Sequence, residues 1–253
     1  MTSWCQDFPQ TRTEFPQLDV LASADSTNRV ASEISAAAHS YHVVITSDQT
    51  AGRGRLGRQW ISRPGESLAL SVLVPAVSEE HLSWFPLVAG ACLVRSLRAA
   101  GLARAQMKWP NDVLIDGGKL AGILCESLPS GRVVAGVGLN IELPGDNEPV
   151  PGSVALAEFA VVTHSLVDSI TCEMLVELRR WAELEHINAE AGARDLIEPV
   201  SGTLGQQVSV HEMDGFVWSG TAEGLSPEGH LVVRTPVGET REVIASDVRH
   251  LRQ

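Results

Sequence analysis

One stretch of the sequence, residues 47–60, combines closely spaced glycines and arginines. Its members are Gly52, Gly54, Gly57, Arg53, Arg55 and Arg58. Glycine lets a backbone approach a ligand closely, and the arginine guanidinium offers a fixed fork of donors for carboxylate or phosphate oxygens. The chain has a net charge of −12. Against that background the stretch predicts an anion-binding loop, although a solvated basic loop is the ordinary alternative.

A second charged group reads Lys-Trp-Pro-Asn-Asp at 108–112, and Lys119 follows it. Lysine beside a carboxylate and an amide suits an anionic or polarised substrate. Asp112 could bind Mg²⁺ or orient an amine, whereas the ordinary alternative is a turn, for which Pro-Asn-Asp is well suited. The two groups together favour an enzyme that handles phosphate. The sequence has no Walker A lysine signature, and no local context marks a catalytic triad.

The spacing Gly-x-Gly-x-x-Gly at 52–57 also matches the dinucleotide-binding fingerprint. That fingerprint must follow a strand and open a helix. Residues 41–47 do predict a strand before it, but residues 67–74 after it are again strand-like, and Pro64-Gly65 interrupts any helix. We therefore reject a dinucleotide-binding fold.

The remaining pattern predicts the elements that must position these groups. Ser26, Thr27 and Asn28 open a helix that continues over 29–38, either as plain capping residues or as a polar ligand site. Residues 1–20 are expected to be irregular and 144–153 to form a loop. Helices are expected over 79–100 and 165–190, and extended segments over 105–109, 113–115, 119–128 and 132–143. Beyond Gly202, short apolar runs separated by glycine turns predict a small β-barrel.

Composition limits the class of protein. The acidic balance argues against a general nucleic-acid or membrane surface. The four cysteines are scattered without metal-ligand spacing, which predicts neither a zinc site nor a disulfide framework. The sequence shows no signal peptide and no apolar run of transmembrane length. We expect a soluble, cytoplasmic protein.

Several of these motifs, taken together and in order, resemble those of the biotin–protein ligases. They are Gly-Arg-Gly-Arg-Leu-Gly-Arg-Gln-Trp at 52–60, Lys-Trp-Pro-Asn-Asp at 108–112, Lys-Leu-Ala-Gly-Ile-Leu at 119–124 and Gly-Val-Gly-Leu-Asn-Ile at 136–141. Ser26-Thr27-Asn28 stands at the expected distance upstream. The resemblance extends from about residue 26 to residue 252.

This resemblance implies an α+β fold with a mixed sheet and flanking helices. It implies a catalytic domain over 1–200, related to class II aminoacyl-tRNA synthetases and lipoate ligases, and an SH3-like β-barrel over 201–253. Some members carry an N-terminal DNA-binding domain. About 25 residues precede Ser26, which is too few for one, so we expect the monofunctional type and no DNA binding.

The implied activity joins biotin to ATP, supplied with Mg²⁺, to give biotinyl-5′-AMP and pyrophosphate. The biotinyl group then passes to a lysine of a biotin carboxyl carrier domain of an acyl-CoA carboxylase. Two rival hypotheses remain open: a lipoate–protein ligase-like acyl transferase, and a regulatory module that senses biotin without catalysis. No membrane partner is expected, and the oligomeric state is left open between a monomer and a weak dimer.

The resemblance also assigns roles to single residues. It implies biotin contacts for Ser26, Thr27, Asn28, Gln49, Arg53, Gly54, Arg55 and Lys119. It implies nucleotide contacts for Arg55, Trp60, Lys108, Asn111 and Asn140. The reacting centre is expected to hold Lys119, Arg53, Arg55 and Asp112.

Overall fold

The computed structural model describes residues 4–5, 7–38, 41–61, 63–76, 78–142, 150–212, 214–244 and 247–251, without the side chains of 185–188 and 247. The loop expected over 144–153 lies largely outside these residues.

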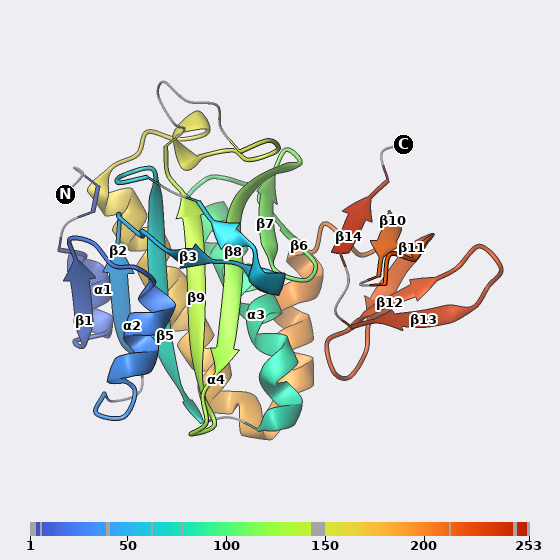
Figure 1. The fold of residues 1–253 in the computed structure, drawn as a ribbon, viewed down its shortest axis with the longest axis horizontal. Coiled ribbons are helices and arrows are strands. Elements are labelled where there is room, and N and C mark those ends of the chain that lie inside the picture. The colour runs from blue at the N-terminus through green and yellow to red at the C-terminus, as the bar shows by residue number, and fades with distance from the viewer. Residues whose placement is uncertain are drawn as a thin grey trace.

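A seven-stranded sheet forms the centre of the larger part of the molecule (Figure 1). Its strand order is β1-β2-β5-β9-β8-β7-β6. The strands are β1 (Leu18–Leu21), β2 (His42–Thr46), β5 (Ser67–Ala76), β9 (Arg132–Asn140), β8 (Gly118–Ser127), β7 (Asp112–Ile115) and β6 (Gln106–Lys108). β1 pairs with β2 in parallel, whereas the other neighbours are antiparallel, so the sheet is mixed.

Helices cover both faces of this sheet. Two long helices, α3 (Phe85–Ala99) and α4 (His164–Ile197), pack against each other behind it, and α1 (Pro9–Glu14) packs on α4. The short α2 (Thr27–Ile34) lies on the opposite face, beside a two-stranded ribbon of β3 (Gly52–Arg53) and β4 (Gln59–Trp60) (Figure 1). Short 3₁₀ segments occur at η1 (Arg55–Gly57), η2 (Glu79–Trp84), η3 (Leu156–Glu158) and η4 (Glu198–Val200). The main core lies between the sheet and the α3–α4 pair.

A second, five-stranded antiparallel sheet follows η4 and stands beside the first (Figure 1). Its order is β13-β12-β11-β10-β14. The strands are β13 (Thr240–Val243), β12 (Leu231–Arg234), β11 (Val217–Leu225), β10 (Gln207–His211) and β14 (Asp247–His250). The predicted α+β class is confirmed, with a mixed sheet, flanking helices and a separate small β structure at the C-terminal end.

Two tryptophans of the larger part of the molecule bind the turn between β11 and β12. The indole of Trp84 donates to the carbonyl of Pro227 at 3.0 Å, and that of Trp109 donates to the carbonyl of Gly229 at 3.2 Å. Gly229 has φ of +77°, and a Cβ there would meet the Trp84 ring at 3.2 Å. The β11–β12 turn is therefore in close contact with the larger part of the molecule.

Some of the predictions about the elements were wrong in part, including the helix expected over 29–38, which ends at Ile34. Residues 1–20 are not irregular, because they contain α1 and the edge strand β1. The helix expected over 79–100 begins as a 3₁₀ segment and becomes α-helical only at Phe85, with a proline in its first turn. The helix expected to end at 190 continues to Ile197.

The described helices include none with the length and apolar character that crossing a bilayer requires. The four cysteines are free thiols in the structure.

Candidate active site

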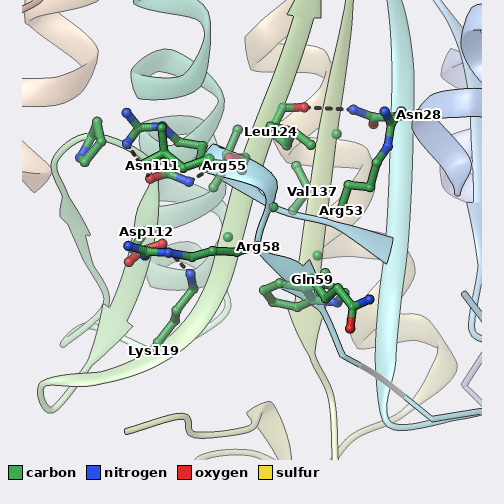
Figure 2. A pocket seen from close by; sticks show the side chains of 18 of the residues that line it. Asn28, Arg53, Arg55, Arg58, Gln59, Asn111, Asp112, Lys119, Leu124 and Val137 are labelled. Atoms are coloured by element: carbon green, nitrogen blue, oxygen red, sulfur yellow. Dashed lines mark hydrogen bonds and ion pairs between the residues drawn. The ribbon is translucent and has the colours of Figure 1, made fainter. Parts of the chain in front are cut away.

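One cavity brings together almost all the residues predicted to act on a ligand. It lies between the first sheet, α2 and the β3–β4 ribbon (Figure 2). The predicted residues that line it are Ser26, Thr27, Asn28, Gln49, Arg53, Gly54, Arg55, Trp60, Lys108, Asn111, Asp112 and Lys119. Segments separated by almost a hundred residues in the sequence therefore meet in one place.

Asn140 is the exception, since it does not line the cavity. Its side-chain amide donates to the carbonyl of Lys119 at 3.2 Å and to that of Val154 at 3.1 Å. The Lys119 N–H in turn donates to the carbonyl of Gly152 at 2.8 Å. Asn140 thus helps to hold the backbone that carries Lys119.

The glycine–arginine stretch forms a narrow hairpin over the cavity. Gly52 pairs with Trp60 and Arg53 with Gln59, and the turn between them contains Leu56 with φ of +56° and Gly57 with φ of +72°. No helix follows the glycines, which agrees with the rejection of a dinucleotide-binding fold.

The hairpin is attached to the sheet through its arginines. Arg53 lies 3.3 Å from the carboxylate of Glu126, and Arg55 donates to the side-chain oxygen of Asn111 at 3.3 Å (Figure 2). Half of the Arg53 side chain is exposed, so this ion pair stabilises the hairpin only weakly.

A β-bulge directs Lys119 into the cavity. Val113 pairs with Ala121 but Leu114 pairs with Lys119, so Leu120 is an extra residue in β8. Alternate residues of a strand face the same side, and the extra residue therefore brings Lys119 onto the same face as Gly122. Bulges commonly redirect a side chain in this way beside active sites.

The ammonium group of Lys119 has two partners in the cavity. It lies 2.6 Å from Oδ1 of Asp112 on the neighbouring strand (Figure 2) and 5.8 Å from the centre of the Trp60 ring. A lysine ammonium has three donors, so one can bind Asp112 while others face an anionic ligand.

Trp60 lies flat against two glycines that pair across neighbouring strands, Gly122 and Gly138. A Cβ on Gly138 would come within 2.5 Å of the Trp60 ring, and one on Gly122 within 3.1 Å. These glycines are therefore required for the close approach of the ring. Within the described part of the chain, the indole nitrogen of Trp60 is buried without a hydrogen-bond partner.

The start of α2 supplies the polar end of the cavity. Ser26 caps the helix by accepting from the N–H of Arg29, which agrees with the capping interpretation. Thr27 and Asn28 do more, since both are buried and bonded to other elements. The N–H of Thr27 donates to Oε1 of Gln49 at 2.9 Å, and Asn28 donates to the carbonyl of Leu124 at 3.1 Å.

Two polar residues here were missed by the sequence analysis. Ser71 on β5 contacts both Thr27 and Asn28, and Glu126 on β8 contacts both Asn28 and Arg53. Gly122, Leu124 and Glu126 alternate along β8 and so face the same side. This alternation was the one sequence signal that could have pointed to Glu126.

The C-terminal sheet also reaches the cavity. Val248 lines it, and Thr203 accepts from the N–H of Trp109, next to Lys108, at 3.1 Å. Thr203 is also bonded to Nε2 of His250 at 3.0 Å. Burial, and then the charge of Lys108, lower the pKa of His250, so this imidazole is neutral at neutral pH.

The described residues contain one group of three metal-binding side chains within reach of one another, Glu228, His230 and Glu242. None of these lines the cavity, where the carboxylate of Asp112 is already paired with Lys119.

Comparisons with known proteins agree with this arrangement. The model of the Biotin/lipoate A/B protein ligase family matches residues 20–141, and that of the Biotin protein ligase C terminal domain matches residues 203–251. The fold and the family models thus define the class of biotin and lipoate ligases.

Individual relatives narrow the class. The biotin–[acetyl-CoA-carboxylase] ligase of Mycobacterium tuberculosis is 35% identical over 93% of this chain and 90% of its own length, and that of Paracoccus denitrificans is 33% identical over 89% and 96%. The biotin protein ligase of Aquifex aeolicus, solved with biotin and ATP, is 25% identical with a TM-score of 0.77, covering 94% of this chain and all of its own. The chain belongs to the biotin–[acetyl-CoA-carboxylase] ligases and is an enzyme of that family.

Proposed function

We propose that this enzyme joins biotin to ATP, forms biotinyl-5′-AMP and pyrophosphate, and transfers biotin to a lysine of a biotin carboxyl carrier domain. One observation carries the proposal: a single cavity holds a buried polar group at one end and cationic side chains at the other. The polar end contains Thr27 and Gln49, and the cationic groups include Arg55 and Lys119.

The cationic side chains address the main physical obstacle to the first step. The carboxylate of biotin and the triphosphate of ATP repel each other. Arg53, Arg55 and Lys119 can hold both anions in position for reaction. The same donors stabilise the charge that develops on the α-phosphate and on the departing pyrophosphate.

The polar end favours biotin over a lipoyl chain. The ureido ring of biotin carries two N–H donors and a carbonyl, whereas a lipoyl tail has no matching groups. A site with polar partners rejects an analogue that leaves them unpaired. The match to the C-terminal biotin ligase domain supports the same choice.

Mg²⁺ is proposed to arrive with ATP as part of the substrate. This ion is usually bound by substrate phosphates and one or two carboxylates rather than by an all-protein cage. Asp112 is the cavity carboxylate closest to Lys119, and it could serve as a single carboxylate ligand of an ion that is held mainly by the phosphates. Bound Mg²⁺ would neutralise phosphate charge.

Asp112 has a second proposed role, in the transfer step. The acceptor lysine must attack as a neutral amine, although its usual pKa is about 10.4. A carboxylate within the site can orient that amine or accept its proton.

We also propose that residues 1–200 form the catalytic domain and 201–253 a separate C-terminal domain, which holds the 108–112 segment through Thr203 and Gly229.

The test follows both steps with purified protein. Biotin and ATP together should release pyrophosphate, and a carrier domain added to the mixture should gain the mass of one biotinyl group. Lipoate replaces biotin in a parallel reaction. Transfer of lipoate in preference to biotin would reject the proposed substrate, and binding of biotin without pyrophosphate release would reject the proposed reaction.

A further inference from the structure

Ser71 lies directly beneath the polar end of the cavity, between two of its predicted ligand-binding residues. It is fully buried on β5. Its hydroxyl oxygen lies 2.7 Å from Oγ1 of Thr27 and 2.7 Å from Oδ1 of Asn28. A buried hydroxyl with two such partners must choose one of them as its acceptor, because it has a single proton.

The surroundings of Asn28 decide that choice. Its amide nitrogen donates to the carbonyl of Leu124 at 3.1 Å and to the carboxylate of Glu126 at 2.6 Å. Two acceptors at this end require the nitrogen there, so the amide oxygen faces Ser71. The oxygen also lies against Gly136, where a Cβ would come within 2.0 Å of it. Both N–H groups of Asn28 are thus used within the protein.

The direction of the neighbouring hydrogen bonds follows. An amide oxygen can only accept, so Ser71 donates to Asn28. The hydroxyl oxygen of Thr27 lies 2.7 Å from that of Ser71 and 3.3 Å from Oε1 of Gln49. Because the proton of Ser71 is used on Asn28, the shorter contact needs the proton of Thr27, which therefore donates to Ser71 and leaves only its lone pairs for a ligand. The N–H of Thr27 donates to Oε1 of Gln49, so Gln49 keeps its N–H groups as donors.

We propose that Ser71 and Glu126 are positioning residues that fix the direction of these hydrogen bonds. Thr27 then presents an acceptor to the ligand, and Asn28 serves only to orient the Thr27 hydroxyl through Ser71. The inference rests on the proposed function, because it takes the ligand to carry a ring N–H. A ring N–H matches the lone pairs of Thr27, whereas a ring oxygen in its place does not. Glu126 also lies 3.3 Å from Arg53, so the same carboxylate connects this series of hydrogen bonds to the β3–β4 hairpin.

The first test compares Ser71→Ala with Ser67→Ala. Ser67 is on the same strand and is equally inaccessible, and within the described residues its hydroxyl has no partner. We expect Ser71→Ala to weaken biotin binding about tenfold, the effect of one lost or misdirected hydrogen bond. The Michaelis constant for ATP should not change. Preference for biotin over an analogue with one ring N–H replaced by oxygen should fall.

The outcomes of this test separate the two proposals. Wild-type protein that does not bind biotin in calorimetry would reject the proposed function and the inference with it. Wild-type protein that binds biotin, together with unchanged affinity and unchanged preference in Ser71→Ala, would reject the inference alone. Ser67→Ala should behave as wild type in every measurement.

The second test uses two substitutions of Glu126. Glu126→Gln keeps an oxygen that accepts from Asn28, so biotin affinity should remain within about threefold of wild type, whereas Glu126→Leu removes the acceptor and should lower it about tenfold. Glu223→Leu is the control, because Glu223 is an exposed partner of Arg234 in the C-terminal sheet. Equal loss in Glu126→Gln and Glu126→Leu, or no loss in either, would overturn the role given to Glu126.

Discussion

The ammonium nitrogen of Lys119 lies 2.6 Å from Oδ1 of Asp112, across the hairpin of β7 and β8 (Figure 2). The two side chains meet because the bulge at Leu120 brings Lys119 to the face that Asp112 occupies. The pair fixes the position of a cation before any ligand arrives. Preorganised charge of this kind stabilises a transition state without reorganisation during the reaction.

We expect Lys119→Ala to impair adenylate formation far more than folding. Removing a charged donor from a reacting centre costs on the order of 2–4 kcal/mol of transition-state stabilisation. The Lys119 side chain is 38% exposed, so its ion pair should add little to the free energy of unfolding. Biotin-dependent pyrophosphate exchange and thermal unfolding measure the two effects separately.

Arg104→Ala is a suitable control for this variant. Arg104 forms an exposed ion pair with Asp116, in the turn between the same two strands, at 2.8 Å. The control should keep normal exchange. Normal exchange in Lys119→Ala as well would show that Lys119 was assigned wrongly.

We expect trypsin to cut the hairpin of residues 52–60 rapidly in the free protein and slowly in the presence of biotin and ATP. The hairpin has only two short strands, and the Arg53 side chain, which pairs with Glu126, is half exposed. Ordering a residue costs about 1–2 kcal/mol, so holding the whole hairpin in one conformation is costly. Anionic ligands would supply further partners for the arginines.

Mass spectrometry of the fragments identifies the cleavage sites, which should be Arg53, Arg55 and Arg58. Cleavage at Arg241, in the C-terminal sheet, serves as an internal reference that ligands should not alter. If ligands leave the cleavage rates at Arg53, Arg55 and Arg58 unchanged relative to that at Arg241, the existing contacts already hold the hairpin and the prediction is wrong.

We expect Gly138→Ala to displace the ring of Trp60, because the new Cβ would lie 2.5 Å from it. If Trp60 contacts the nucleotide, the Michaelis constant for ATP should rise about fivefold, which corresponds to about 1 kcal/mol of aromatic contact. Overpacking should also lower stability by about 1–3 kcal/mol.

Gly224→Ala provides the comparison, since a Cβ on Gly224 in β11 meets nothing within 4 Å. That variant should keep its affinity for ATP. A normal Michaelis constant in Gly138→Ala, together with the expected loss of stability, would remove Trp60 from the nucleotide site.

The motif residues could be predicted because their types and local spacing are unusual. Arg53, Arg55 and Lys119 stand out in an acidic chain, and the structure does bring them to one cavity. Ser71 and Glu126 could not be found in this way. Each lies in a mostly apolar run outside any motif, and its importance arises from long-range pairing, such as that of Ser71 with Gly136.

Local rules also failed where tertiary contacts decided the outcome. Pro9 suggested an irregular segment, yet it occupies the first turn of α1, where a missing N–H is harmless. That helix is held by Asp168 of α4, which accepts from the N–H of Thr11 at 3.0 Å. The bulge at Leu120 likewise depends on how β7 and β8 pair, and nothing in the local sequence indicates it.

His250 should make the stability of the protein depend on pH. Burial, and then the charge of Lys108, lower its pKa in the folded protein below the value of about 6.5 in an unfolded chain. The unfolded state therefore binds more protons just below pH 6.5, so this contribution to stability is fully present above about pH 6.5 and is lost as the pH falls toward the folded pKa. Protonation would also place a second positive charge near Lys108. We expect the melting temperature of the wild type to fall between about pH 7.5 and about pH 5 more steeply than that of His250→Gln.

His211→Gln, in the same sheet, is the control and should follow the wild type. Parallel pH profiles for the wild type and His250→Gln would show that His250 does not contribute to the pH dependence.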